Sequence, residues 1–479
     1  MSERSHSPNL DKSTIFFFSF GQLAEGLMNS AFAILLFFYF NQVLGLSGTL
    51  CGLALLIATS IDAITDPVMG TISDNWRSSL GRRHPFMYAS ALPLAISFYF
   101  LFAPAFDSGN ALFVWLTGFA ILTRMSMTLF HVPHMAFGAE LSDDFDRRTN
   151  LVAYRMLFGV SGWILLNAGF AVLFAPTDEY PNGQLNPANY PWFAGMLSVG
   201  IFVSIVLTSW GTRSVIPFLH QPPPTQKDHL NQSLEDVRIS LTNVSFRWLV
   251  ISYVVGSIPA AIAGSLALYV NTFYWELTPS QIPAVMLAGS IATLVGYAIA
   301  PIAGRRVDKR QLMMAGAFLW AMATLTPFAM RFLGAFPPIG TPWSVAFLMC
   351  CAIVGGAGLA QLVVAVSSML ADVADEHELA EGQRSEGVFF GVFSFCTKAS
   401  SGIGIAIAGI LIDLIAWPTG ATIRTAADIP ADTLTLLAVI AGPLVVVALS
   451  PVFYCIHQYK IDRTRHAEIQ VALNQRRRS

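Results

Sequence analysis

The stretch STIFFFSFGQLAEGLMNSAFAILLFFYF, residues 13–40, contains one charged side chain, Glu25. A helix needs about 20 predominantly apolar residues to cross the hydrocarbon core of a bilayer. This run is long enough, and similar apolar runs follow along the 479 residues. The composition agrees, with 54% hydrophobic residues, 12% charged residues and a mean hydropathy of +0.58. Because a soluble protein carries about 25% charged residues, the sequence predicts an all-α integral membrane protein.

Hydropathy predicts twelve transmembrane helices in two halves of six. The first six spans are expected near 15–40, 49–72, 84–103, 111–138, 150–174 and 192–213. The second six are expected near 244–271, 282–303, 312–332, 343–370, 386–416 and 433–457. A polar segment containing QPPPTQKD separates the halves. The predicted domains are therefore an N-terminal half at 1–218, a linker at 219–243 and a C-terminal half at 244–479.

Basic residues gather in every second predicted loop, in the linker and in the C-terminal tail. By the positive-inside rule, both termini and the linker are expected in the cytoplasm. A weak internal repeat supports two equivalent halves, since GTISDNWRSSLGRR (70–83) and GRRVDKR (304–310) both place Gly, Asp and Arg at a short hairpin. Two six-span halves of parallel topology are the layout of major-facilitator transporters.

The composition argues against several other classes of protein. A net charge of -2 without a long basic face predicts no nucleic-acid partner. The five cysteines lie in predicted spans without disulfide or metal-ligand spacing: Cys51, Cys350, Cys351, Cys396 and Cys455. No P-loop, nucleophile elbow or zinc-protease motif occurs, so neither an enzyme nor a cofactor is expected. His131 and His134 lack the clustered partners of a metal site.

The stretch SIDAITDPVMG, residues 60–70, places two carboxylates inside the second predicted span. Asp62 and Asp66 are one turn apart on the same helix face. Asp66 lies eight residues before Asp74, which puts it about 12 Å from the hairpin. Intramembrane carboxylates usually mark functional sites, and a proton or small cation would relieve their mutual repulsion. The pair predicts a coupling-ion site; the alternatives are a carboxylate that orders the helix end and a static salt bridge.

Further polar residues inside predicted spans one, four and five indicate a substrate cavity. The candidates for substrate contact are Glu25, Asn29, Arg124, His131, Met135 and Arg155. For Glu25 and Arg124, a structural ion pair is an equally good interpretation. Lys398 lies fourteen residues past Arg384, too deep in span eleven to reach the membrane surface, so it needs a carboxylate or a polar cavity.

Three longer segments carry a family resemblance: DAITDP (62–67) followed by RSSLGRRHPF (77–86), HVPHMAFGAELSDDFDRRTNLVAYR (131–155), and LADVADEHELAEGQRSEGVFFGVFSFCTKASSG (370–402). Over essentially its whole length the chain resembles the glycoside–pentoside–hexuronide:cation symporters. This family is the melibiose-permease branch of the major-facilitator fold.

The resemblance implies cation-coupled symport of a sugar or glycoside by alternating access, driven by sodium or protons. It implies that Asp62 and Asp66 bind the coupling cation, which would be the only metal ion, and that Lys398 links cation and sugar binding. Arg155 would lie near the sugar pocket. The gating residues at the cytoplasmic hairpin would be Asp74, Arg82 and Arg83. A monomer in a bacterial inner membrane is expected.

The chain also departs from melibiose permease. His131 stands where that protein has an aspartate in span four, Met135 replaces a tryptophan, and Gly26 aligns with a sugar-binding aspartate in span one. Arg124 is an addition that could meet an acidic substrate such as a uronate. The identity of the sugar therefore stays open. Two alternatives remain: a transporter of lysophospholipids or other amphiphiles, and a non-transporting membrane sensor or scaffold.

Overall fold

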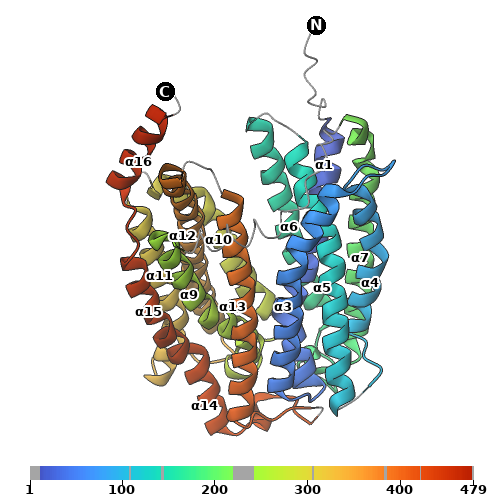
Figure 1. Ribbon diagram of the computed structural model, residues 1–479. Coiled ribbons are helices and arrows are strands. Elements are labelled where there is room, and N and C mark those ends of the chain that lie inside the picture. Colours follow the sequence, from blue (N-terminus) through green and yellow to red (C-terminus); the bar gives the residue numbers. More distant parts are fainter. Residues whose placement is uncertain are drawn as a thin grey trace. The chain divides into compact units, whose positions relative to one another are not determined.

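The computed structural model describes residues 11–106, 109–141, 145–218, 242–304, 307–381, 386–420 and 422–476. The regular structure in these ranges is helical, as Figure 1 shows. The all-α prediction is confirmed. The predicted linker at 219–243 lies almost wholly outside the described residues, as do Arg384 and residues 305–306 of the second basic hairpin.

The chain forms two compact units. The first comprises the described residues of 1–225 and 412–429, and the second those of 226–411 and 430–479. The segment 412–429 thus packs with the first unit although it follows the helices of the second. The domain boundaries derived from the sequence assign residues 412–429 to the C-terminal half, and these boundaries stay a prediction.

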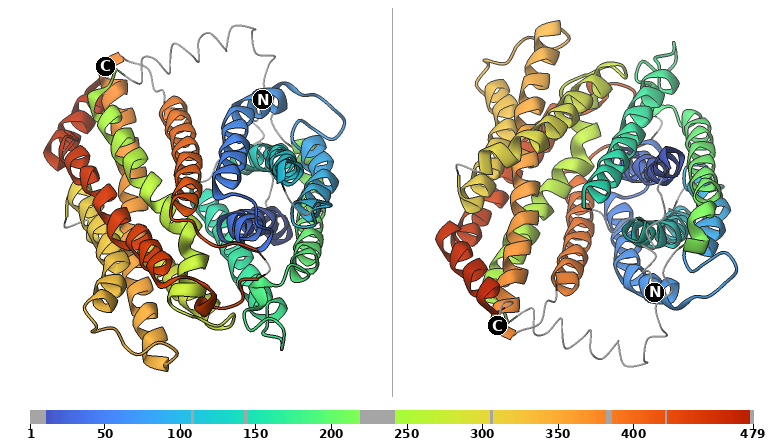
Figure 2. Two further views of the ribbon diagram at one scale, coloured as in Figure 1. Left: turned by 90° about the horizontal axis from the view of Figure 1, so that it is seen from below. Right: turned by 90° about the horizontal axis from the view of Figure 1, so that it is seen from above.

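The helices of the first unit run along a common direction and form a bundle when seen end-on (Figure 2). They are α1 (Lys12–Phe20), α2 (Gln22–Ala31), η1 (Phe32–Leu36), η2 (Tyr39–Val43), α3 (Gly48–Asn75), α4 (His84–Leu101), α5 (Gly109–Glu140), α6 (Phe145–Leu173), η3 (Gly183–Leu185), α7 (Asn189–Gly211) and η4 (Arg213–Phe218); η6 (Ala426–Asp428) lies in the returning segment.

The second unit contains α9 (Val244–Tyr269), η5 (Val270–Tyr274), α10 (Gln281–Gly304), α11 (Lys309–Phe332), α12 (Pro342–Glu381), α13 (Glu386–Leu414), α14 (Ala431–Val439), η7 (Ile440–Leu444), α15 (Val445–His457) and α16 (Arg463–Arg476). The last residues of α13, from Ile412 on, pack with the first unit.

Ten helical segments within the described ranges are long and apolar enough to cross a membrane. The two remaining predicted spans are also helical. Span one runs from α1 to η2, where a break at Gly21 and two π-helical turns divide it into short pieces. Span three corresponds to α4, whose 18 residues include His84 and two prolines. These elements together account for the twelve predicted spans.

Glycines bring α2 and α6 into close contact. A Cβ added at Gly26 would lie 2.3 Å from the carbonyl oxygen of Gly159, and one added at Gly162 would lie 2.8 Å from the backbone nitrogen of Leu27. Small residues at helix contacts let the backbones approach closely in membranes. Gly26 therefore lies in a helix contact.

Gly26→Ala should destabilise the protein by about 1–3 kcal/mol, because a methyl group at this contact must push the two helix backbones apart. Thermal unfolding of the purified protein in detergent measures the effect. Gly118→Ala is the matched control, since a Cβ at this glycine inside α5 meets nothing within 4 Å. Equal unfolding temperatures for the two variants would show that the α2–α6 contact accommodates the methyl group without loss of stability.

The C-terminal tail contains a helix that the hydropathy analysis did not predict. Helix α16 buries Ile469 and Leu473 against the second unit, and Gln470 donates a hydrogen bond to Asp375 on α12 at 2.7 Å. The hydropathy of this mostly polar sequence does not indicate the contact, because the buried apolar side chains of α16 are two residues spaced four apart.

The segment that returns to the first unit is fixed by polar contacts. Asp413 accepts hydrogen bonds from the Ser47 hydroxyl at 2.7 Å and from the backbone N–H groups of Gly48 and Thr49 at 2.8 Å. It therefore caps the first turn of α3, where an anion is favoured. Trp417 donates its indole N–H to Gln42 at 2.6 Å. These contacts hold the segment at the end of α3 opposite Asp74.

Candidate functional site

The two intramembrane carboxylates converge on one hydroxyl group. Oγ1 of Thr128 on α5 lies 3.1 Å from Oδ1 of Asp62 and 2.9 Å from Oδ1 of Asp66, both on α3. Asp62 is buried and Asp66 half-buried. Because a hydroxyl has one proton to donate, it bonds one carboxylate at a time. A proton or small cation would reduce the repulsion between the two carboxylates.

Arg124 approaches this pair from one turn earlier on α5. Its Nη1 lies 3.7 Å from Oδ2 of Asp62, and its guanidinium lies over the Phe32 ring, 4.7 Å from the ring centre. On the sequence alone, substrate binding and a structural ion pair were equally good interpretations of Arg124. The geometry shows an ion pair with Asp62, and contact with a substrate stays a prediction.

Glu25 forms a second polar group in the same unit. Its carboxylate lies 2.8 Å from Nδ1 of His131 on α5 and accepts a hydrogen bond from the side-chain amide of Gln22. Both Glu25 and His131 remain part-exposed, with side-chain exposures of 21% and 31%. An acid paired with an imidazole can accept and donate hydrogen bonds to the hydroxyl groups of a ligand.

The other predicted substrate contacts lie on the same three helices. Arg155 on α6 is mostly buried and directs Nη1 at the sulfur atom of Met135 on α5. Met135 is itself 36% exposed, and Asn29 on α2 is exposed. The first unit thus places Glu25, Asn29, His131, Met135 and Arg155 on α2, α5 and α6. Their contact with a substrate stays a prediction.

His134 serves the packing of the bundle. Its Nε2 lies 2.8 Å from the carbonyl oxygen of Phe18, and its ring is stacked on Phe130. One ring nitrogen is therefore engaged by the backbone. Within the described ranges, no three His, Cys, Asp or Glu side chains gather in a way that could hold a metal ion.

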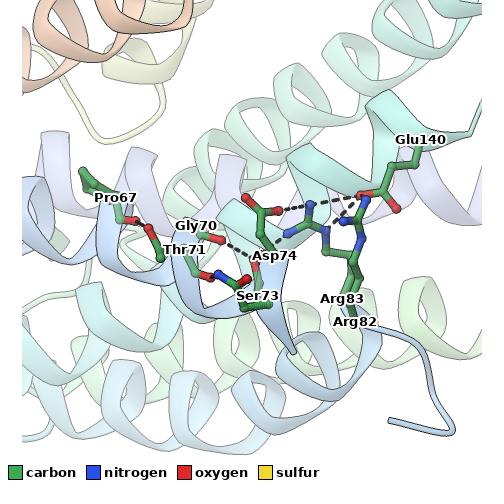
Figure 3. A network of polar contacts seen from close by, with 9 residues as sticks. Pro67, Gly70, Thr71, Ser73, Asp74, Arg82, Arg83 and Glu140 are labelled. Atoms are coloured by element: carbon green, nitrogen blue, oxygen red, sulfur yellow. Dashed lines mark hydrogen bonds and ion pairs between the residues drawn. The ribbon is translucent and has the colours of Figure 1, made fainter. Parts of the chain in front are cut away.

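The predicted gating residues form a network at the other end of α3 (Figure 3). Arg83 forms an ion pair with Asp74 and donates hydrogen bonds to Ser73 at 2.6 Å and to Glu140 at 3.0 Å. Arg82 lies 2.8 Å from the same Glu140 oxygen. Glu140 closes the network from the end of α5. Sequence reasoning did not select it, although it lies in the quoted segment 131–155, because a carboxylate at a helix end is ordinarily solvated.

The second unit has a smaller counterpart at the repeated hairpin. Lys309, at the start of α11, lies 2.7 and 2.8 Å from the two carboxylate oxygens of Asp372 on α12. His466 on α16 lies 3.3 Å from the same carboxylate. The weak repeat in the sequence thus corresponds to a basic–acidic pair in each unit.

Lys398 lies on α13 in the second unit, where its side chain is half-buried. It lies more than three helical turns past Glu386, the first residue of α13, as its position in the sequence implied. Its role in coupling stays a prediction.

A model of the family described as MFS/sugar transport protein matches residues 17–463. The chain belongs to this family. Among its relatives, the inner membrane symporter YicJ of Escherichia coli is 24% identical over 82% of this chain and 80% of that protein. The isoprimeverose transporter of Lactiplantibacillus pentosus is 22% identical over 83% and 79%. The sodium-dependent lysophosphatidylcholine symporter 1-A of Danio rerio is 22% identical over 94% and 85%.

A solved structure shows the same fold. The crystal structure of the nucleoside transporter NupG (D323A mutant) has a TM-score of 0.65 at 15% identity, covering 93% of this chain and 99% of NupG. The resemblance to glycoside–pentoside–hexuronide:cation symporters and the major-facilitator fold are therefore confirmed. The chain is a multi-pass membrane symporter and, like its relatives, a transporter rather than an enzyme.

Proposed function

We propose that this protein couples the entry of a cation, sodium or a proton, to the uptake of a sugar or glycoside. The observation that carries the proposal is the convergence of Asp62 and Asp66 on the Thr128 hydroxyl. Arg124 offsets one of the two negative charges, and the second is costly at this depth unless a cation or proton accompanies it. A site that gains and loses such a cation in each cycle is what symport requires.

The substrate would bind beside the cation in the first unit. Glu25 and His131 offer a hydrogen-bond acceptor and an imidazole, and Arg155 adds a positive charge next to the thioether of Met135. Sugar hydroxyl groups pair well with such groups. The family description and the name of the isoprimeverose transporter support a sugar as the substrate.

Transport would proceed by alternating access, with each half rocking about a midplane site. Cation binding would favour the state that binds sugar, and sugar would tighten cation binding by the same factor, because coupling between two sites is reciprocal. The Arg83 network would stabilise one closed state at its end of α3. The distribution of basic residues supports a cytoplasmic position for both termini. The name of the inner membrane symporter YicJ supports a bacterial inner membrane.

A lysophospholipid is the second candidate for the substrate. The Danio rerio relative is named for lysophosphatidylcholine. The exposed Met135, at the position of a tryptophan in melibiose permease, offers a flexible apolar contact that suits an acyl chain.

A ligand-dependent thermal-shift screen distinguishes these candidates. Purified protein is heated with glycosides, pentoses, uronates and a lysolipid, each with and without sodium and at two pH values. We expect a sugar to raise the unfolding temperature and a cation to enlarge the shift. Stabilisation by the lysolipid alone would replace the sugar as substrate. No stabilisation by any cation–ligand combination would contradict the proposed function.

A further inference from the structure

Arg124 brings a fixed positive charge to the carboxylate pair. Its Nη1 lies 3.7 Å from Asp62, and the exposed fractions of the two side chains are 20% and 7%. We propose that this guanidinium holds the place beside Asp62 that a sodium ion would otherwise take, so that Arg124 sets the cation preference of the site. The inference rests on the proposed function, since it concerns the same coupling site.

The arrangement on α5 supports this role. Arg124 and Thr128 are four residues apart and therefore lie on one face of the helix. Thr128 contacts both carboxylates, and Arg124 contacts the carboxylate that is more deeply buried. The guanidinium therefore lies beside the side chains whose oxygen atoms would coordinate sodium.

Within the described residues, charge and stacking hold Arg124 in place. A separation of 3.7 Å is longer than an N–H···O hydrogen bond, and the buried Nε has no hydrogen-bond partner in the described ranges. The face of Phe32 supplies a cation–π contact. Such a group can compete for Asp62 and still move when the transporter changes state.

The competition follows from charge and from space. Sodium is a hard cation that takes oxygen ligands, as calcium and magnesium do, and a guanidinium beside Asp62 both repels it and covers one of its carboxylate ligands. An arginine stays protonated at every physiological pH. The wild-type protein should therefore show little selective response to sodium.

Sodium titration of thermal stability tests the inference on the full chain in detergent, with choline chloride keeping the ionic strength constant. In Arg124→Gln, the sodium concentration at half-maximal stabilisation should fall by about tenfold or more relative to wild type. Arg124→Lys keeps the charge and should behave like wild type. Arg213→Gln is the matched control, because Arg213 also lies over an aromatic ring, that of Trp210, outside the carboxylate group.

The double variant Asp62→Asn with Arg124→Gln should lose this gain in sodium response, because the carboxylate that would bind sodium is gone. Sodium-selective stabilisation of the wild type that equals that of Arg124→Gln would overturn the inference and leave the proposed function standing. A gain in Arg124→Lys equal to that in Arg124→Gln would also overturn it, as would lost ligand binding in Arg124→Gln with an unchanged sodium response.

If Arg124→Gln does not fold, the wild-type titration decides, because selective stabilisation by sodium over choline contradicts a resident competitor. Failure of the proposed function looks different. In that case wild-type protein in vesicles accumulates no ligand under either a sodium or a proton gradient.

Discussion

Asp66→Asn should abolish gradient-driven uptake of the substrate. The substitution keeps the size of the side chain and the hydrogen bond from the Thr128 hydroxyl, which lies 2.9 Å away, but removes the negative charge that would attract the cation. Coupling between two ligands is typically about 5- to 150-fold in affinity, and this factor should disappear. Uptake into vesicles under an imposed cation gradient measures the loss.

Exchange of labelled for unlabelled substrate in the same vesicles supplies the internal reference, since exchange needs no net cation movement and should persist. Asp432→Asn is the matched control, because this exposed aspartate lies in the first turn of α14, which belongs to the second unit. Full cation-driven accumulation by Asp66→Asn would remove this residue from the coupling site.

Arg83→Gln should destabilise the first unit by about 1–3 kcal/mol, the usual effect of losing buried hydrogen bonds to a charged group, because the Asp74 side chain is 54% exposed and stays solvated. Arg83 is only 4% exposed and bonds Ser73, Asp74 and Glu140 together. A neutral amide would leave Asp74 and Glu140 without this cation, although Arg82 still reaches Glu140. Thermal unfolding in detergent should show a clearly lowered midpoint.

Arg77→Gln serves as the control in the same hairpin, because Arg77 is exposed and surface charges contribute little. If Arg83→Gln unfolded at the wild-type temperature while remaining correctly inserted, the network would contribute nothing to the stability of the fold. Its proposed gating role would then lack a physical basis.

The sequence predicted the helical spans closely because the bilayer imposes one strong constraint, the length of an apolar run. The predicted second span at 49–72 is α3, Gly48–Asn75, and the predicted eleventh span at 386–416 is α13, Glu386–Leu414. Helix α16 was not predicted because Ile469 and Leu473 are its two buried apolar side chains in a mostly polar sequence.

The side-chain partners were harder to predict, because they come from residues far apart in the chain. The spacing of Asp62 and Asp66 identified the carboxylate pair, but only packing of α3 against α5 reveals that Thr128 and Arg124 complete the group. The cap on α3 provided by Asp413 crosses more than 360 residues of sequence. No local pattern indicates such a contact.

Cation-driven accumulation in reconstituted vesicles is the most direct test of the central claim. Wild-type protein would be given the sugar found in the thermal-shift screen, with an inward gradient of sodium, of protons or of neither. We predict that one of the two gradients raises the internal sugar concentration above the external one, and that Asp66→Asn only equalises the two. Equal accumulation with and without a gradient would contradict symport at the Asp62–Asp66 site.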